Sequence, residues 1–314
     1  MSIKLADFFC GVGGIRLGFE TADSKFSCVF SNDIDKNALK TYRSNFENVE
    51  EQSITDLDIN DIPDFDIFLG GFPCQPFSIA GNRKGFNDER GNLFFNIIDI
   101  LEKKKPKAFF LENVKNLKTH NNGNTFKIIK NRLIQAGYYF KSKILNTSEY
   151  SNIPQNRERI FLVGFRDIEK ARKFRFPKKI VLNKKITDFL ESDVNPKYYY
   201  TANSAIYTRL ADSVKKHVDT GQVYQYRRHY VRENKSNVCP TLTANMGGGG
   251  HNVPIIRDDN GIRKLTPKEC FYLQGFPTDF TLPNISDSQL YKQAGNSVTV
   301  KIIKRIAIEI AKVI

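Results

Sequence analysis

The chain has 314 residues, of which 40% are hydrophobic, and a formal net charge of +14. This length is enough for two domains with a sizeable core. No apolar run reaches the roughly 18 residues of a membrane-spanning helix. The opening MSIKLADFF has neither the apolar region nor the cleavage site of a signal peptide. These features predict a cytoplasmic protein without a membrane partner.

The cysteines and histidines argue against disulfides and metals. Five cysteines, an odd number without a CxxC pair, favour reduced thiols. The four histidines are scattered and show no zinc-ligand spacing, so we expect no metal site.

The charge is unevenly distributed along the chain. Residues 1–100 contain 9 Lys and Arg against 16 Asp and Glu, whereas the remaining residues contain 39 against 18. This asymmetry is typical of a protein whose later part contacts a polyanion. A solvated basic surface in a lysine-rich proteome explains it equally well.

The first half of the chain alternates short β-rich runs with helical periodicity. Strands are expected at residues 3–9, 26–32, 66–71, 107–113, 138–146 and 159–165, and helices at 15–22, 34–46 and 92–104. Strand and helix in alternation predict an α/β fold with a doubly wound, mainly parallel sheet.

The pattern becomes irregular after Phe176-Pro177. We therefore expect a first domain over 1–185 and a smaller, irregular second domain over 186–284. A C-terminal segment, 285–314, has helical spacing from residue 298 and is expected to return to the first domain.

Glycines follow the first predicted strand in DFFCGVGG, residues 7–14. A doubly wound fold binds ligands at the carboxyl ends of its strands, where this turn is expected to lie. The turn is neither GxGxxG, because Arg16 replaces the third glycine, nor a Walker loop, which disfavours a pyrophosphate. Asp33, at the end of the second strand, could accept bonds from two ribose hydroxyls, and Phe9 could face an adenine. The pattern suits S-adenosylmethionine, although an ordinary tight turn with a helix N-cap aspartate explains it too.

Two prolines bracket Cys74 in GGFPCQPFS, residues 70–78. Proline and glycine fix the backbone here, which indicates a held thiol rather than a buried hydrophobe. Glu112 ends the strand at 107–113, so the topology brings a carboxyl group and a thiol to the same edge. Arg157 and Arg159 are two residues apart and are expected on one face of a strand. Taken singly, Glu112 could form a strand-end salt bridge, and Arg157 could clamp a phosphate or carboxylate.

Together these groups fit methyl transfer to C5 of cytosine. Addition of a thiolate to C6 makes C5 nucleophilic, provided that N3 is held by an acid. Glu112 would supply that contact, while Arg157 would hold the base O2 and offset the developing charge.

The motifs DFFCGVGG, GGFPCQPFS, LENVKNL, PQNRERIF and QAGNSVTV resemble the ordered motifs of bacterial C5-cytosine DNA methyltransferases. The resemblance implies that Cys74 is the nucleophile, that Glu112 contacts N3, and that Arg157 and Arg159 shape the base pocket. It further implies that 1–185 is the catalytic and cofactor-binding domain and 186–284 the target-recognition domain. It also implies an S-adenosylmethionine pocket, with S-adenosylhomocysteine as product, lined by Phe9, Gly11, Gly14, Asp33, Ile34, Ile54, Pro73, Leu93, Asn296, Ser297 and Val298.

The chain departs from the family at two cofactor positions. Ile34 stands where members often have tryptophan, and Ser53 stands where many have an aspartate that reads the adenine amino group. Because Ser53 replaces that aspartate, we expect the neighbouring Ile54 rather than Ser53 to contact the cofactor.

Double-stranded DNA is the partner that the resemblance implies, with the target cytosine flipped out of the duplex. Arg83 and Lys84, which follow Cys74, are expected to meet phosphates. In YQYRRHYVREN, residues 224–234, Arg227, Arg228 and Arg232 are interleaved with aromatics and are expected to contact DNA, at bases or phosphates.

The sequence therefore predicts a DNA (cytosine-5)-methyltransferase that protects host DNA from a cognate restriction endonuclease. We expect a monomer with no obligate protein partner, since each monomer needs only one flipped base. Two alternatives stay open: a tRNA cytosine-5 methyltransferase of the same fold, and a DNA-binding regulator without turnover.

Overall fold

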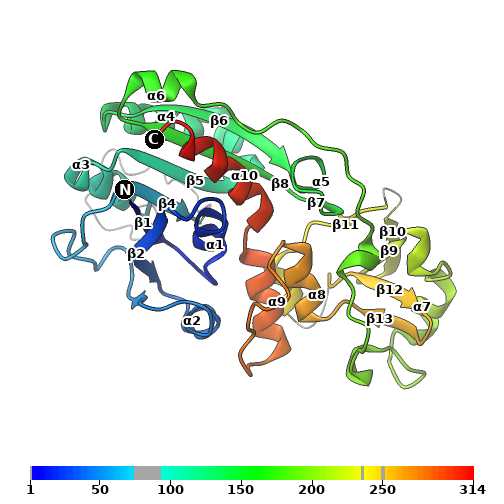
Figure 1. Cartoon of the computed structure of the whole chain (residues 1–314). Coiled ribbons are helices and arrows are strands. Elements are labelled where there is room, and N and C mark those ends of the chain that lie inside the picture. The colour runs from blue at the N-terminus through cyan, green and yellow to red at the C-terminus, as the bar shows by residue number, and fades with distance from the viewer. Residues whose placement is uncertain (1, 74–92, 235–236, 249–251) are drawn as a thin grey trace. The chain divides into compact units, whose positions relative to one another are not determined.

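The computed structural model describes residues 2–73, 93–234, 237–248 and 252–314 (Figure 1). The chain forms two compact units. The first contains Met1–Leu145, Glu158–Pro177 and Ile303–Ile314, and the second contains Asn146–Arg157 and Lys178–Ile302. The second unit therefore extends beyond the predicted domain 186–284 at both ends.

The first unit is built on a seven-stranded sheet in the order β3-β2-β1-β4-β5-β8-β6. Pairing is parallel from β3 through β5, and β8 runs antiparallel to β5. The predicted doubly wound, mainly parallel sheet is confirmed. Its strands are β1 (Ile3–Phe8), β2 (Phe26–Asp33), β3 (Glu50–Glu51), β4 (Ile67–Gly71), β5 (Ala108–Val114), β6 (Tyr139–Asn146) and β8 (Glu158–Phe165).

Helices join and cover these strands. They are α1 (Gly14–Glu20), α2 (Lys36–Arg43), α3 (Leu93–Lys104), α4 (Asn124–Gln135), α6 (Ile168–Lys173) and α10 (Val300–Ala311). The expected helices at 15–22, 34–46 and 92–104 are thus confirmed, with shorter bounds at most ends. Each crossover returns the chain to the same end of the sheet, which is how parallel strands are joined.

Burial explains why the central strands read as continuous apolar runs. The first four residues of β4 and the first six of β5 are buried, because helices cover both faces of a parallel sheet. Phe8 and Phe68 stack at 4.5 Å between ring centroids in the core beneath the site. This packing holds β1 against β4.

The C-terminal helix confirms its expected return to the first unit. Ile303, Ile306, Ala307 and Ile310 recur at helical spacing and are fully buried. Lys25 Nζ donates to the Ala311 carbonyl at 2.7 Å, and Lys170 Nζ donates to the Ile314 carbonyl at 3.0 Å.

The second unit contains a small four-stranded sheet in the order β10-β9-β12-β13. Its elements are α5 (Thr147–Tyr150), β7 (Gln155–Asn156), α7 (Tyr207–Ser213), β9 (Val223–Arg227), β10 (Tyr230–Asn234), β11 (Cys239–Pro240), β12 (Ile255–Asp258), β13 (Gly261–Lys264), α8 (Pro267–Leu273) and α9 (Asp287–Asn296). Arg263 is fully buried and bridges β13 to α8 through two 2.8 Å contacts with Glu269. The short strands explain the irregular sequence pattern.

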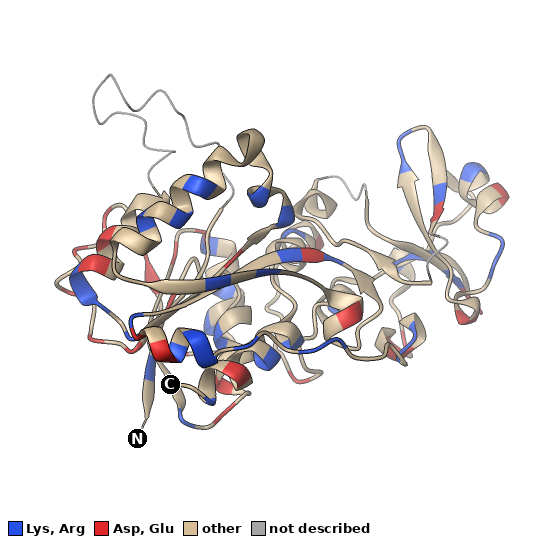
Figure 2. Ribbon diagram, turned by 90° about the horizontal axis from the view of Figure 1, so that it is seen from above, with Lys and Arg blue, Asp and Glu red and all other residues tan. Residues whose placement is uncertain are grey.

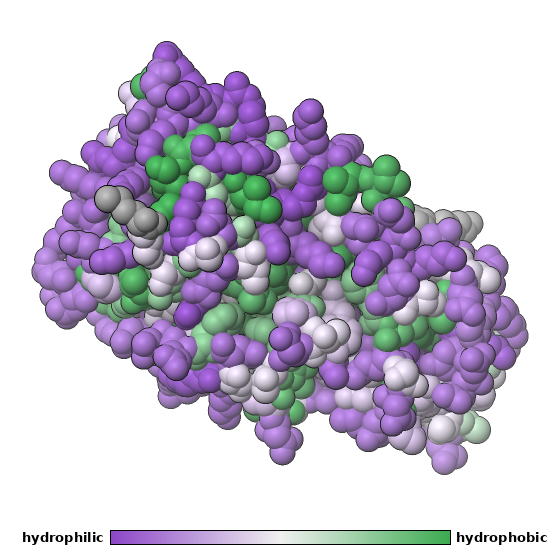
Figure 3. Space-filling view, in the orientation of Figure 1, coloured by the Kyte–Doolittle hydropathy of each residue, from purple (hydrophilic) through white to green (hydrophobic). Residues whose placement is uncertain are grey.

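The surface is largely polar on the face shown in Figure 3, with hydrophobic side chains in small groups. Lys and Arg are spread over helices, strands and loops of both units rather than gathered on one element (Figure 2). Among the described residues, no helix combines the length and apolar character needed to cross a membrane.

Candidate active site

The carboxyl ends of four parallel strands meet at one edge of the first unit's sheet. Phe8 at the end of β1 pairs with Asn32 of β2 and with Gly70 of β4. Gly71, which ends β4, pairs with Glu112 of β5. The turn after β1, the acid after β2 and the Glu112 carboxyl group therefore share the edge at which this fold binds ligands.

A hydrogen bond joins the glycine turn to Asp33. Gly11 N–H donates to Asp33 Oδ2 at 2.8 Å, and Asp35 N–H donates to Asp33 Oδ1 at 2.8 Å. Gly11 has a φ of +55°, a left-handed conformation that favours glycine. Burial raises the pKa of the Asp33 carboxyl group despite these two donors. The backbone thus orients a half-buried carboxyl group at the edge of the sheet where this fold binds ligands.

The other predicted cofactor residues of the first unit differ in exposure. Ile34 is 68% exposed, an unusual fraction for a large hydrophobic side chain. Pro73 is also exposed, whereas Phe9 and Leu93 are half-buried and Ile54 is buried. Gly14 is the first residue of α1. The exposed Ile34 beside Asp33 is available to cover an apolar ring.

The sequence did not predict the polar network that joins α1, the helix after the glycine turn, to α2. Arg16 Nη1 donates to Tyr42 Oη at 2.9 Å, and Tyr42 Oη lies 2.6 Å from Ser31 Oγ. The Arg16 guanidinium also lies 4.7 Å from the Phe46 ring centroid. Arg16 thus ties α1 to α2 from the position where a dinucleotide fold has its third glycine. Only that irregularity in the motif gave a signal.

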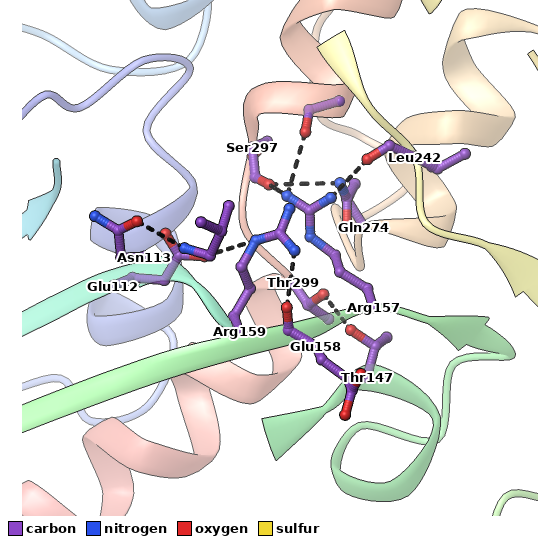
Figure 4. A network of polar contacts seen from close by, with 12 residues as sticks. Glu112, Asn113, Thr147, Arg157, Glu158, Arg159, Leu242, Gln274, Ser297 and Thr299 are labelled. Atoms are coloured by element: carbon purple, nitrogen blue, oxygen red, sulfur yellow. Dashed lines mark hydrogen bonds and ion pairs between the residues drawn. The ribbon is translucent and has the colours of Figure 1, made fainter. Parts of the chain in front are cut away.

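Glu112 and Arg159 form an ion pair inside the first unit (Figure 4). Arg159 Nε on β8 lies 3.2 Å from Glu112 Oε1 on β5, and both side chains are largely buried. Loss of either partner would leave the other polar group buried without this contact, which is costly. The structure therefore brings the predicted acid together with one of the two predicted arginines.

Asn113 holds the chain where it enters the Cys74 motif. Its Nδ2 donates to the Phe72 carbonyl at 2.8 Å, and both residues are buried. Phe72 is two residues before Cys74 in the sequence. Cys74, Arg83 and Lys84 lie outside the described residues.

The prediction that Arg157 and Arg159 share one face of a strand is wrong. Arg159 lies on β8, but Arg157 lies between β7 and β8 and belongs to the second unit. Its guanidinium donates to the backbone carbonyls of Leu242, at 2.7 Å, Gly295, at 3.2 Å, and Ser297. Arg157 therefore organises main chain from distant parts of the second unit.

The predicted cofactor residues Asn296, Ser297 and Val298 follow this anchored main chain. Asn296 ends α9, and Thr299 Oγ1 lies 2.7 Å from Thr147 Oγ1. A Cβ added to Gly295 would lie 2.1 Å from the Thr243 carbonyl carbon, which explains the glycine in QAGNSVTV. Gln274 Nε2 adds a 2.6 Å bond to the Ala294 carbonyl. The sequence gave no signal for the supporting roles of Gln274 and Thr147.

The four described cysteines are poor nucleophiles. Cys10, Cys239 and Cys270 are buried, and burial raises the pKa of each thiol well above its usual value. Cys28 is half-buried rather than in the core, and burial raises its pKa to about 11. A thiol attacks as the thiolate, so none of these four is suited to attack near neutral pH.

The predicted DNA-binding arginines of the second unit lie on one hairpin. Arg227 ends β9, Arg228 is in the turn, and Arg232 lies on β10. All three side chains are exposed. Within the described parts of the chain, no group of three or more His, Cys, Asp or Glu residues could hold a metal ion.

Comparison with known proteins identifies the family. The family model described as C-5 cytosine-specific DNA methylase matches residues 3–312. The chain is 51% identical to Type II methyltransferase M.Bsp6I of Bacillus sp. (strain RFL6), over 99% of each chain. It is 39% identical to Type II methyltransferase M.HhaI of Haemophilus parahaemolyticus, over 98% of this chain and 94% of that protein.

Solved structures agree on the fold. A crystal structure of a mutant Spodoptera frugiperda DNMT2 covers 99% of this chain and is itself fully covered, with a TM-score of 0.78 and 22% identity. The sheet edge described above, with its glycine turn, its carboxylates and its paired arginine, is thus found in a chain that matches one family almost end to end. The chain belongs to the C-5 cytosine-specific DNA methylases.

Proposed function

We propose that this chain methylates C5 of a flipped-out cytosine in a short, specific duplex site through a covalent bond between Cys74 and C6. The observation that carries the proposal is the Glu112–Arg159 pair on β5 and β8, which lies beside the strand leading to Cys74. Asn113, next to Glu112, also holds the Phe72 carbonyl two residues before the thiol. This juxtaposition supports a thiol and an acid acting on one base.

Each protein group has a defined task in this reaction. The Cys74 thiolate adds to C6 while the Glu112 carboxyl group, in its acid form, donates its proton to N3, so that the negative charge developing on the ring is neutralised. When bound, S-adenosylmethionine supplies the methyl group from its sulfonium and leaves as S-adenosylhomocysteine. A base then removes the C5 proton, the C6–S bond breaks, and the thiolate is regenerated.

The contacts assign different roles to the two arginines. The Arg157 guanidinium donates to three backbone carbonyls, so Arg157 is a positioning residue for the segments at Leu242 and Ser297. Arg159 pairs with Glu112 instead, which supports a contact with the base O2. We therefore transfer the expected O2 contact from Arg157 to Arg159.

The residues of the first unit fit S-adenosylmethionine as the methyl donor. Asp33 is oriented by Gly11 and can accept from ribose hydroxyls, while the exposed Ile34 can cover an adenine face. Among the described residues, no atom lies within 4 Å of the place where a Gly11 Cβ would stand. Phe9, Gly14, Ile54, Pro73, Leu93, Asn296, Ser297 and Val298 complete the proposed cofactor set.

Protection against a cognate restriction endonuclease is the proposed biological role, because relatives 51% and 46% identical to this chain are named Type II methyltransferases. Arg83, Lys84, Arg227, Arg228 and Arg232 are the proposed DNA contacts, and a monomer is sufficient for the reaction. The likeness to DNMT2 structures, at 22% identity, is a likeness of fold alone.

The test is methylation of unmodified genomic DNA, followed by base-resolution mapping of 5-methylcytosine. We expect 5-methylcytosine at one short recurring sequence and none in a parallel reaction with tRNA. Methylation of tRNA but not of DNA would favour the RNA-modifying alternative. Absence of 5-methylcytosine from both substrates, despite binding of DNA, would favour the regulator.

A further inference from the structure

The β9–β10 hairpin of the second unit has two chemically different faces. Tyr226 and its cross-strand partner Val231 pack against a small core that includes Leu210 of α7. Because side chains alternate across a strand, Arg227 and Arg232 project from the opposite face. One face of the hairpin is therefore structural, and the other is available to a ligand.

The available face borders a hollow of about 510 Å³. Tyr226, Arg227, Arg228 and His229 line it from the hairpin, so the Tyr226 ring reaches both the core and the hollow. Asn245, Gly248 and Asn252 line it from the segment after β11. None of these residues is acidic. The hollow thus combines positive charge with neutral hydrogen-bonding groups, which suits an electron-rich ligand.

Arg227 is oriented without losing its charge. Its Nη1 donates to Asn252 Oδ1 at 3.0 Å, and its Nη2 donates to Gln225 Oε1 at 3.2 Å. Both acceptors are neutral amides, and Gln225 is buried. Contacts with described residues use two of the five guanidinium N–H groups, which leaves three for a ligand. Fixing the head group in advance lowers the entropy cost of binding.

The hairpin arginines differ in their charge balance from the arginines that the fold pairs with carboxylates. Arg16, Arg159 and Arg263 each pair with a carboxylate within 3.2 Å. No ion pair among the described residues involves Arg227, Arg228 or Arg232. Their charges are therefore left for a partner that carries negative charge or strong acceptors.

Arg228 has a costly backbone conformation. Its φ is +50°, in the left-handed region where glycine or asparagine is usual. Its carbonyl accepts from Tyr226 Oη at 2.7 Å and from Arg209 Nη1 at 3.3 Å, which fixes the turn. No described residue accepts a hydrogen bond from the Arg228 guanidinium. The fold uses only the backbone of Arg228, so the exposed side chain is free to contact a ligand.

We propose that Arg227 is the specificity-determining residue that reads a guanine edge in the target duplex, and that Arg228 contacts a phosphate. The assignment rests on the proposed function. Guanine presents two acceptors, N7 and O6, which a fixed guanidinium can bind at the same time. An exposed, untethered arginine at a turn suits a phosphate, which positions the protein but carries no sequence information.

The test compares Arg227→Ala and Arg228→Ala on the mapped site and on duplexes with each non-target base pair replaced in turn. Turnover and competition binding are both measured. Arg227→Ala should lower kcat/KM on the mapped site by roughly 10- to 100-fold and abolish discrimination at one base pair. Arg228→Ala should weaken binding of all duplexes alike. It should also reduce the slope of log affinity against log salt concentration by about one.

Two further variants separate function from structure. Arg257→Ala removes the same charge from β12 on the α7 face, where Arg257 Nη1 donates to the Val214 carbonyl at 3.5 Å. It should leave discrimination unchanged. Arg228→Gly relieves the left-handed conformation, so its Tm should equal or exceed that of the parent chain while duplex affinity falls. Unchanged affinity in Arg228→Gly would contradict a phosphate contact.

The outcomes also separate this inference from the proposed function. Full discrimination by Arg227→Ala at every base pair would overturn the Arg227 assignment, and a changed base preference in Arg228→Ala would overturn the division of roles. Competition binding among duplexes selected by affinity needs no turnover. A parent chain that selects one duplex sequence but forms no 5-methylcytosine would therefore contradict the proposed function alone.

Discussion

Asn113 Nδ2 donates a 2.8 Å hydrogen bond to the Phe72 carbonyl, and so connects the strand that bears Glu112 to the chain entering the Cys74 motif. The two residues are 41 positions apart and both are buried. Because β4 and β5 are paired in parallel up to Gly71 and Glu112, this bond extends their pairing by one residue beyond the end of β4. It gives Glu112 and the chain that leads toward Cys74 a common support.

Removal of this bond should reduce turnover more than substrate binding. In Asn113→Ala the Phe72 carbonyl loses its partner, at a cost of about 1–3 kcal/mol for a buried polar group. We expect kcat to fall roughly tenfold or more, with the Kd for S-adenosylmethionine within about twofold of the parent value. Single-turnover kinetics and titration calorimetry measure the two effects. An unchanged kcat would show that the bond does not position the nucleophile segment.

Asp33 should control cofactor affinity. Asp33→Ala removes an acceptor for ribose hydroxyls and should raise the Kd for S-adenosylmethionine roughly 10- to 100-fold, as expected for hydrogen bonds to a charged group. Asp35→Asn is the matched control. It removes a charge from the same loop but keeps the N-cap acceptor for Asn37 and Ala38 of α2. Equal losses in both variants would indicate a general charge effect rather than a ribose contact.

Glu112 should act on turnover. Glu112→Gln keeps the size of the side chain but removes its charge beside Arg159, and kcat should fall roughly 100- to 1000-fold while duplex affinity is retained. Glu158→Gln is the control, because Glu158, the first residue of β8, forms a more exposed ion pair with Lys115. A Glu112→Gln enzyme with parental kcat would remove Glu112 from the reaction.

Asp7 should make stability depend on pH. Its side chain is fully buried, and burial raises the pKa from 3.8 to about 7. A raised folded-state pKa stabilises the protein below about pH 4, and this contribution is lost as the pH rises through about 7. Asp7→Asn cannot ionise, so its unfolding free energy relative to the parent should rise by up to roughly 4 kcal/mol between those limits.

Urea unfolding across this pH range measures the Asp7 effect. Asp64→Asn serves as control, because the Asp64 side chain is 97% exposed. If Asp7 keeps an ordinary pKa in the folded protein, the unfolding free energies of the parent chain and of Asp7→Asn will change with pH in parallel. That result would contradict the effect of burial.

The sequence predicted the central strands because their apolar runs are long and sharply bounded. The segment KAFFLEN at 107–113 became β5, Ala108–Val114, almost without change. Asp33 and Glu112 were placed at strand ends, and parallel pairing then brought both to one edge. These inferences use only periodicity and topology, which are local properties of the chain.

Contacts between distant segments could not be predicted in this way. Arg157 was expected on a strand beside Arg159, but the chain leaves β7 and enters β8 at that point, and Arg157 turns to carbonyls near Leu242 and Ser297. The Arg16–Tyr42 bond likewise depends on how α1 packs against α2. Such side chains have no period or motif that reveals their partners.

Covalent trapping tests the central claim most directly. A duplex with 5-fluorocytosine at the mapped target is incubated with the chain and S-adenosylmethionine, and the products are separated under denaturing conditions. The fluorine prevents the final elimination, so we predict a denaturation-resistant protein–DNA complex for the parent chain and none for Cys74→Ser. A Cys74→Ser variant that still forms the complex, or that methylates an unmodified duplex at the parental rate, would contradict nucleophilic catalysis by Cys74.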